Sequence, residues 1–186
     1  MHRVVVILGS NIDKERNLPA AVRLLSGMVE VIDVSGVYET APMGLLEQPR
    51  FFNAAILIRT DLTPEKLKDG PLAAVERRLG RHRAADKNAP RTIDLDIVLY
   101  DDDVMTYTPG DGRVRRLPDA DLLHFAHCAL PVADLLPDMP HPETGEPMQT
   151  IAARLLRVAT TEHSDAIRPR PDIDLRRAAR NSLITG

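Results

Sequence analysis

The sequence predicts an α+β fold of the ferredoxin-like, split βαβ kind, with an antiparallel sheet and helices on one face. The main observation is the order of the periodic segments between residues 4 and 100, which runs strand, helix, strand, strand, helix, strand. With 186 residues, the chain is long enough for one domain with a sizeable core. Its composition, 44% hydrophobic and 27% charged, is that of an ordinary globular protein.

The first part of the sheet is predicted from three segments. Residues 4–8 form a continuous apolar run that ends at Gly-Ser-Asn, which is typical of a buried strand followed by a turn. Residues 17–28 repeat apolar side chains at helical spacing, with Pro19 in the first turn, where proline is tolerated. Residues 29–38 mix apolar and polar side chains, as a half-exposed strand would.

A loop, a strand and a second helix follow. Residues 39–50 contain two prolines and a glycine, and the length of this loop favours a functional role. Residues 51–58 have the composition of a third strand. The helical pattern of residues 63–79 begins with Thr63 as N-cap. We expect a kink or restart at Pro71, because proline lacks an amide hydrogen and collides with the preceding turn.

The last core strand and a C-terminal helical extension complete the prediction. Residues 91–100 are rich in β-branched and apolar side chains and predict a mostly buried strand. Short helices are expected at 121–136 and 148–158, outside the split βαβ core. We expect residues 1–158 to form a single domain and residues 159–186 to form a polar, arginine-rich tail with weak order.

The bulk properties limit the classes of partner and the compartment. A formal net charge of −3 gives no support for nucleic acid as the main partner. A single cysteine, Cys128, excludes an internal disulfide and fits a reducing compartment. The apolar run near the N-terminus is too short for a signal peptide or a membrane span. We therefore expect a cytoplasmic protein that acts on small molecules, without a sequence signal for its oligomeric state.

Two carboxylates stand out in the strand predicted at 91–100. Side chains alternate faces along a strand, so Asp94 and Asp96 point the same way, a few ångströms apart. Two anions side by side on a buried strand repel one another and are poorly solvated, so they require a cation. One interpretation is a strand end with salt-bridged acids. The other is a divalent-metal site that holds a polyphosphate.

Arginines lie close to these acids in the sequence. Arg91 precedes the acids on the strand, and Arg81 and Arg83 belong to the basic loop at 81–90. A guanidinium grips a phosphate through two hydrogen bonds and keeps its charge at neutral pH. Taken alone, Arg81 and Arg83 also fit a solvated helix end stabilised by the helix dipole. With Arg91 and the acids in register, phosphate contact is the favoured interpretation.

Five blocks of the sequence resemble the 6-hydroxymethyl-7,8-dihydropterin pyrophosphokinase family, an enzyme family of folate synthesis. The most specific block is the run Lys87-x-Ala89-Pro90-Arg91-x-x-Asp94-Leu95-Asp96-Ile97-Val98. The other blocks are Leu8-Gly9-Ser10-Asn11, Tyr38-Glu39-Thr40-Ala41-Pro42-Met43-Gly44, Gln48-Pro49-x-Phe51-Phe52-Asn53-Ala54 and Glu76-x-x-Leu79-Gly80-Arg81-x-Arg83. Together they cover roughly the first hundred residues in the family's order.

The resemblance implies a ferredoxin-like core and a transfer of the pyrophosphoryl group of ATP to the hydroxymethyl group of the pterin, with release of AMP. It implies that Asp94 and Asp96 hold two Mg²⁺ ions and that Arg81 and Arg91 contact phosphate. The implied pterin-binding residues are Thr40, Pro42, Met43, Phe51 and Asn53. The implied nucleotide-binding residues are Glu76, Arg83, Ile97 and Arg116. Without the family, ordinary core packing would be the better interpretation of Phe51.

The sequence departs from the family pattern after residue 117. Asp119 stands where members carry a histidine, Phe125 where they carry an arginine, and His127 where they carry an aromatic residue that stacks on the pterin. His127 and His124 together with Asp121 could also be metal ligands, but such a spacing is more often a set of surface polar residues. The departure affects the segment that is expected to cover the pterin and the nucleotide.

Three functions therefore remain open at the level of sequence. The first is the pterin pyrophosphokinase on the usual folate substrate. The second is a divergent pyrophosphokinase for a related pterin in a non-folate pathway. The third is a non-catalytic relative that binds a pterin or a nucleotide, against which the complete set of Arg91, Asp94 and Asp96 argues.

Overall fold

The computed structural model describes residues 1–42, 47–81, 89–162 and 166–180. The chain order of the first elements is β1 (His2–Ser10), α1 (Lys14–Ser26), β2 (Glu30–Val34), β3 (Tyr38–Thr40), β4 (Phe51–Thr60), α2 (Pro64–Leu67), η1 (Lys68–Leu72), α3 (Ala73–Arg78) and β5 (Asp94–Tyr100). The later elements are β6 (Met105–Tyr107), β7 (Arg115–Leu117), α4 (Asp121–His124), α5 (Ala126–Leu135), α6 (Met148–Glu162), β8 (Ile167–Pro169) and α7 (Leu175–Arg180).

The main sheet confirms the ferredoxin-like prediction. Within the described residues its strands follow the order β5-β1-β4-β3-β8, and β2 also pairs with β4. Each of these pairs is antiparallel. Strand β5, which carries the paired aspartates, forms one edge of this sheet. Its neighbour β1 lies between β5 and β4, so the centre of the sheet supports the edge on which the acids stand.

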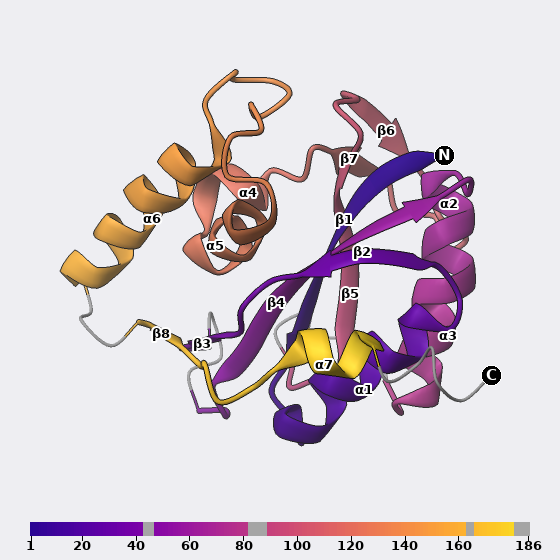
Figure 1. The fold of residues 1–186 in the computed structure, drawn as a ribbon, viewed down its shortest axis with the longest axis horizontal. Coiled ribbons are helices and arrows are strands. Elements are labelled where there is room, and N and C mark those ends of the chain that lie inside the picture. Colours follow the sequence, from indigo (N-terminus) through magenta and orange to yellow (C-terminus); the bar gives the residue numbers. More distant parts are fainter. Residues whose placement is uncertain (43–46, 82–88, 163–165, 181–186) are drawn as a thin grey trace.

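Both faces of the sheet are covered by helices (Figure 1). The two predicted core helices, α1 and the α2–η1–α3 segment, pack on one face, as expected. The predicted helical extension, α4 to α6, packs on the opposite face. Alternate residues of β1 enter the two cores, with Val4 and Val6 on the first face and Val5 on the second. Burial on both faces explains the continuous apolar run of this strand.

The segment predicted as one strand over residues 29–38 is two strands, β2 and β3, which both pair with β4. Ser35 separates them. Its main-chain N–H donates to the carbonyl of Ala55 at 2.9 Å, and its hydroxyl accepts the N–H of Ala55 at 2.8 Å. The hydroxyl thus accepts a hydrogen bond that a main-chain carbonyl would accept in regular strand pairing. This interrupts the pairing and lets the chain bend between the two strands.

The helix predicted over residues 63–79 has the expected cap and the expected interruption. The hydroxyl of Thr63 accepts the N–H of Lys66 at 3.4 Å. The interruption at Pro71 is a turn of π-helix, η1, between α2 and α3. Because Pro71 cannot donate a hydrogen bond, the helix widens by one residue there instead of ending. Lys68, the first residue of this wide turn, is buried.

The prediction of a weakly ordered tail is wrong for residues 166–180. Helix α6 crosses the expected boundary at residue 158 and ends at Glu162. Strand β8 pairs with β3, and α7 packs against α1 and enters the first core through Leu175. This packing is hard to predict from the sequence, because only a few apolar residues interrupt a polar, arginine-rich segment.

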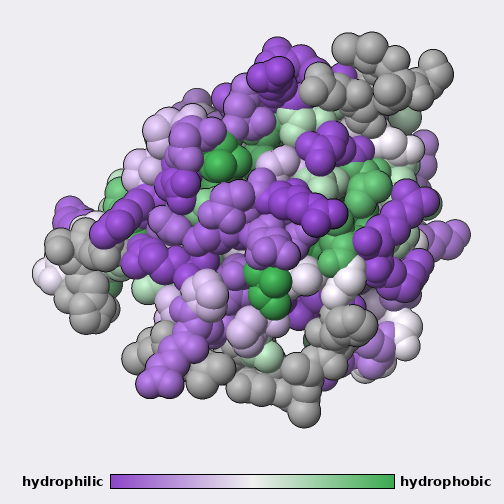
Figure 2. Space-filling model, turned by 90° about the horizontal axis from the view of Figure 1, so that it is seen from below, coloured by the Kyte–Doolittle hydropathy of each residue, from purple (hydrophilic) through white to green (hydrophobic). Residues whose placement is uncertain are grey.

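The surface seen from below in Figure 2 is mostly hydrophilic, and hydrophobic residues appear there in separate patches. Exposed large hydrophobic side chains are scattered along the chain, for example Ile12, Ile32 and Val158. Within the described residues, none of the helices combines the length and the apolar content needed to cross a lipid bilayer.

We predict that Leu175→Ala lowers the free energy of unfolding by about 2–4 kcal/mol, because it removes a buried side chain from the first core. Arg177→Ala, at an exposed position of the same helix, is the matched control and should change it by less than about 0.5 kcal/mol. Chemical denaturation of both variants checks the prediction. Equal stability of the two variants would show that α7 does not belong to the core.

Candidate functional site

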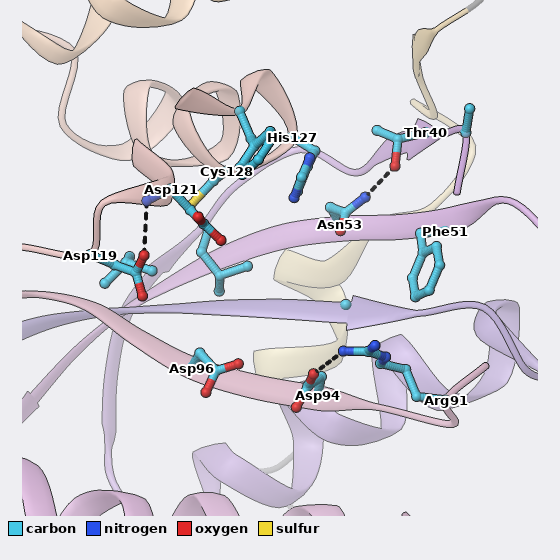
Figure 3. Close-up of a pocket in the computed structure, with 15 residues that line it drawn as sticks. Thr40, Phe51, Asn53, Arg91, Asp94, Asp96, Asp119, Asp121, His127 and Cys128 are labelled. Carbon is cyan, nitrogen blue, oxygen red and sulfur yellow. Dashed lines mark hydrogen bonds and ion pairs between the residues drawn. The ribbon is translucent and has the colours of Figure 1, made fainter. Parts of the chain in front are cut away.

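A cavity of about 460 Å³ opens between the sheet and the beginning of α5. Three groups of side chains surround it in Figure 3: acids and an arginine on and beside β5, polar and aromatic residues on β3 and β4, and the segment that leads into α5. The lining residues are Ile7, Gly9, Thr40, Ala41, Phe51, Asn53, Arg91, Asp94, Asp96, Val98, Asp119, Asp121, Phe125, His127 and Cys128.

The first of the two acids is held by arginines. The Asp94 carboxylate accepts a short hydrogen bond from Nη1 of Arg91 at its Oδ2 atom, and Nη2 of Arg81 lies 3.5 Å from the same oxygen. Both arginine side chains are largely buried, with 18% and 14% of their surface exposed. Arg81 also keeps a buried Nε without a hydrogen-bond partner in the described part of the chain. A charged donor left in this position is available to an anionic ligand.

The second acid is held by a lysine that the sequence did not single out. Nζ of Lys68 donates to Oδ1 of Asp96 at 2.8 Å and to the main-chain oxygen of Leu95. Burial alone would raise the pKa of Asp96, but the charge and the hydrogen bond of Lys68 outweigh burial and lower that pKa. Burial would lower the pKa of Lys68, but Asp96 and Glu76 raise it, so Lys68 is an ammonium ion at neutral pH.

The turn after β1 fixes the main chain beside Arg91. The Oδ1 atom of Asn11 accepts the N–H of Arg91 at 2.8 Å, and the N–H of Asn11 donates to the carbonyl of Arg91 at 3.1 Å. The hydroxyl of Ser10 donates to the carbonyl of Thr92 at 2.5 Å. The amide of Asn11 also donates to the carbonyl of Pro49 at 3.1 Å. These bonds join the end of β1 to the segment before β5, and they fix the main chain that carries Arg91.

The polar side of the cavity lies on β3 and β4. The amide of Asn53 donates to the hydroxyl of Thr40 at 2.8 Å, and both residues are buried. The amide oxygen and the remaining amide hydrogen of Asn53 can serve a ligand with a mixed donor and acceptor edge. The Arg91 guanidinium lies 5.7 Å from the centroid of the Phe51 ring. The aromatic side and the charged side of the cavity therefore meet at Arg91 (Figure 3).

The third side of the cavity contains the residues that depart from the family pattern. The rings of Phe125 and His127 are stacked, with centroids 5.4 Å apart and planes inclined by 22°. Burial lowers the pKa of His127, so its imidazole is neutral at physiological pH. Burial and the charges of Asp121 and Asp96 raise the pKa of Asp119 to about 6. The carboxylate of Asp119 also accepts the N–H of Asp121 at 2.9 Å.

The structure brings most of the predicted site together. Thr40, Phe51, Asn53, Arg91, Asp94 and Asp96 all line the cavity, and Arg81 reaches it through Asp94. Pro42 follows the lining residue Ala41. Met43 and Arg83 lie outside the described residues.

Three residues expected near the nucleotide do not line the cavity. Glu76 is buried and accepts the N–H of Leu95 at 3.0 Å. The side chain of Ile97 packs in the first core. Arg116 is 60% exposed and contacts the carboxylate of Glu143. The charge of the neighbouring Arg115 lowers the pKa of Asp96.

Lys68 and Arg115 do not line the cavity, but both act on its acid Asp96, and sequence reasoning missed them. In the sequence, nothing distinguishes Lys68 from the polar residues that are expected on the exposed side of its helix. The wide turn η1 directs its side chain to β5. Arg115 belongs to the hairpin β6–β7, which the sequence did not predict, and it is held by both oxygens of Asp111 at 3.1 and 2.7 Å. The sequence signal that could have pointed to Lys68 is its position just before Gly70-Pro71, where the helix is interrupted.

The chemistry of the donor set fits Mg²⁺. The protein cations contact Oδ2 of Asp94 and Oδ1 of Asp96, and both carboxylates line the cavity. Mg²⁺ is commonly held by one or two carboxylates together with substrate phosphates and water. The alternative site of Asp121, His124 and His127 is not supported: in the described residues, no group of three or more His, Cys, Asp or Glu could hold a metal.

Fold and site together define an α+β, ferredoxin-like protein whose cavity combines paired carboxylates, arginines and aromatic rings. Residues 5–137 match the family model of 7,8-dihydro-6-hydroxymethylpterin-pyrophosphokinase (HPPK). The chain belongs to the HPPK family.

Two relatives in sequence agree with this membership. The chain is 36% identical over 150 residues to the folic acid synthesis protein of Schizosaccharomyces pombe, covering 79% of this chain and 20% of that protein. It is 33% identical over 156 residues to 2-amino-4-hydroxy-6-hydroxymethyldihydropteridine pyrophosphokinase of Pseudomonas aeruginosa, covering 82% of this chain and 92% of that protein. The chain thus spans about a fifth of the length of the fungal relatives it matches.

The wild-type HPPK-DHPS protein of Plasmodium falciparum has a similar structure, with a TM-score of 0.70 over 90% of this chain and 50% of that chain. The sequence identity is 11%, so this similarity concerns the fold alone.

We predict that Asp119→Asn stabilises the protein above pH 7 by about 1–2 kcal/mol, and that this gain disappears near pH 4. The folded-state pKa of about 6 lies above the ordinary value of 3.8, so the folded protein prefers the protonated carboxyl. Ionisation therefore costs stability as the pH rises from about 4 through 6. Denaturant unfolding of both proteins across this range checks the prediction. A constant difference at all pH values would contradict it.

Proposed function

We propose that this protein transfers the pyrophosphoryl group of ATP to the hydroxymethyl group of 6-hydroxymethyl-7,8-dihydropterin and releases AMP, in folate biosynthesis. The observation that supports this proposal best is the cavity itself, in which Asp94 and Asp96 share one face of β5 opposite Asn53 and Phe51. The two carboxylates suit a polyphosphate that is bound with a divalent metal ion. The amide of Asn53 and the ring of Phe51 suit a flat heterocycle with a polar edge. Membership of the HPPK family supports the same reaction.

In this proposal the arginines act at the phosphate end. Arg91 and Arg81 converge on Asp94 and present guanidinium donors beside the cavity. They would hold the transferring phosphates and offset the negative charge that develops during transfer at the β-phosphorus. The carboxylates of Asp94 and Asp96 would hold two Mg²⁺ ions. Mg²⁺ held there would supply positive charge that offsets the negative charge of the transferring group.

At the acceptor end, Asn53 and Thr40 would bind the edge of the pterin, with Pro42 and Met43 in the adjoining loop. The hydrogen bond between Asn53 and Thr40 orients the amide, so a bound ring meets a fixed pattern of donor and acceptor. Phe51 offers a ring face on one side of the cavity, and His127 offers another from α5 (Figure 3). A flat heterocycle between two such rings gains stacking energy and orientation.

The remaining assignments concern the nucleotide. Arg83, Ile97 and Arg116 are proposed to contact it, and Glu76 is proposed to act through Leu95, whose N–H it binds. We further propose that the protein works in the cytoplasm, because its single cysteine is buried and fits a reducing compartment.

A specific observation favours a second candidate, a pyrophosphokinase for a related pterin in a non-folate pathway. Asp119 and Asp121 add two carboxylates to the cavity, and Phe125 stands where family members carry an arginine. An acidic wall disfavours an acceptor or nucleotide group with negative charge and favours one that donates hydrogen bonds. A non-catalytic pterin- or nucleotide-binding relative is the third candidate, and the same assay distinguishes all three.

The assay is the release of AMP from ATP with Mg²⁺, with and without 6-hydroxymethyl-7,8-dihydropterin. We expect AMP only when the pterin is present. Release with a different dihydropterin only would select the second candidate. Nucleotide binding without AMP under any condition would exclude both enzyme functions.

We predict that Asp96→Ala lowers the rate of AMP release by about a thousandfold or more, because it removes a carboxylate proposed to hold Mg²⁺. Asp138→Ala, a change of an exposed aspartate outside the cavity, is the matched control and should leave the rate unchanged. Circular dichroism of both variants checks that the fold is retained. Full activity of folded Asp96→Ala would disprove the metal assignment.

We predict that Asn53→Ala raises the KM for the pterin about ten- to a hundredfold and changes kcat less, because the lost amide binds ground state and transition state alike. Thr40→Val keeps the size of the side chain but removes the hydroxyl that orients Asn53, so it should raise the KM in the same direction by a smaller factor. Steady-state kinetics at saturating ATP measure both. An unchanged KM in Asn53→Ala would remove Asn53 from the pterin site.

A further inference from the structure

Lys68 is a buried lysine whose ammonium group reaches the phosphate end of the cavity from behind β5. Its side chain is 4% exposed, whereas that of Asp96, which it contacts at 2.8 Å, is 46% exposed. Glu76 lies 3.4 Å from the same ammonium and is also buried. A buried ammonium with two carboxylate neighbours keeps its charge, so a permanent cation stands next to Asp96.

The free edge of β5 explains how this cation is held. Both main-chain groups of Leu95 bond to side chains instead of a neighbouring strand, the N–H to Glu76 and the carbonyl to Lys68. An edge strand otherwise leaves such groups unpaired. The pair of Lys68 and Glu76 therefore satisfies both main-chain groups of Leu95, and Lys68 at the same time fixes one oxygen of Asp96.

The wide turn η1 places the two residues in line. Positions eight residues apart, as Lys68 and Glu76 are, differ by roughly a quarter of a turn in a regular α-helix. The π-turn from Lys68 to Leu72 contains one extra residue and brings both side chains to the same strand. Pro71, which causes the wide turn, is thus the sequence feature that directs Lys68 to the cavity.

Among the described residues that ion pairs join to Asp94 and Asp96, positive and negative charges balance without a metal. The cations are Arg81, Arg91 and Lys68, and the anions are Asp94, Asp96 and Glu76. The affinity of a carboxylate site for a divalent cation increases with its uncompensated negative charge. Because a cation contacts each of the two aspartates directly, Lys68 at Asp96 and Arg91 at Asp94, these carboxylates attract a hydrated metal ion weakly.

We infer that Lys68 is a resident cation that keeps the nucleotide-free site from binding a divalent metal, so that the metal enters together with the polyphosphate. A metal bound to a polyphosphate brings compensating negative charge, which Lys68 and the arginines do not repel. Lys68 is on this account a positioning residue that acts through Asp96. The inference rests on the proposed function in taking Asp94 and Asp96 as metal ligands.

The test is binding of Mn²⁺ to the nucleotide-free protein, followed by the loss of the free-ion signal in electron paramagnetic resonance. Lys68→Met removes the charge and keeps the length of the side chain, and we expect it to bind Mn²⁺ at least about tenfold more tightly. Lys68→Arg keeps the charge and should stay within about threefold of the unaltered protein. Lys66→Met changes an exposed lysine of α2 and is the matched control, with unchanged affinity.

A second variant allows for poor folding of Lys68→Met, which leaves Glu76 buried without its cation. Lys68→Met combined with Glu76→Gln keeps an acceptor for Leu95 and leaves the total charge unchanged. We expect tighter Mn²⁺ binding in this variant as well, because the cation nearest Asp96 is lost. With a non-hydrolysable ATP analogue bound, the difference from the unaltered protein should shrink to about threefold or less.

Equal or weaker Mn²⁺ binding in folded Lys68→Met, alone or combined with Glu76→Gln, would overturn the inference and leave Lys68 with a structural role only. The proposed function is decided separately by AMP release from the unaltered protein. Tighter Mn²⁺ binding in the variants together with no AMP release would refute the transfer reaction and retain the role of Lys68.

Discussion

The constraint on which this structure depends is the neutralisation of two carboxylates on one face of an edge strand. Asp94 and Asp96 stand side by side on β5, where their repulsion and partial burial would oppose folding without cations. Arginines from the preceding segment hold the first acid, and a lysine from the neighbouring helix holds the second. A polyphosphate needs cations of the same kind. The cations that let Asp94 and Asp96 be accommodated in the fold therefore also form the proposed binding site.

The rest of the sheet keeps this arrangement rigid. The turn after β1 bonds to the main chain on both sides of Arg91, and β1 joins β5 to β4, which carries Asn53 and Phe51. The distance between the charged and the polar ends of the cavity is therefore set by paired strands and not by loops. A reaction that joins two substrates benefits from such fixed geometry, because orientation then costs little at the moment of transfer.

The C-terminal half modifies a site that the core provides. Helices α4 to α6 cover the second face of the sheet. The segment from Asp119 to His127, which leads through α4 into α5, supplies Asp119, Phe125 and His127 to the cavity. Strand β8 extends the sheet beyond β3, and Arg170 bonds to the carbonyl of Val37 through its N–H and pairs with Glu39 at 3.5 Å. The wall that differs from the family pattern thus belongs to elements outside the split βαβ core, where replacements disturb the sheet least.

The sequence by itself determined the order of the core elements, the cap at Thr63, the interruption at Pro71 and the common face of Asp94 and Asp96, because period and cap chemistry are local properties. Only the tertiary structure decided that Lys68 meets Asp96, that the charge of Arg115 acts on Asp96, and that residues 166–180 join the sheet and its core. These contacts join residues far apart in the chain. A lysine on a helix has the same local pattern whether it faces solvent or the edge of β5. The pairing of Asp94 and Asp96 on one face could be predicted from the sequence. The contact between Lys68 and Asp96 could not, because it depends on one extra residue in a helical turn.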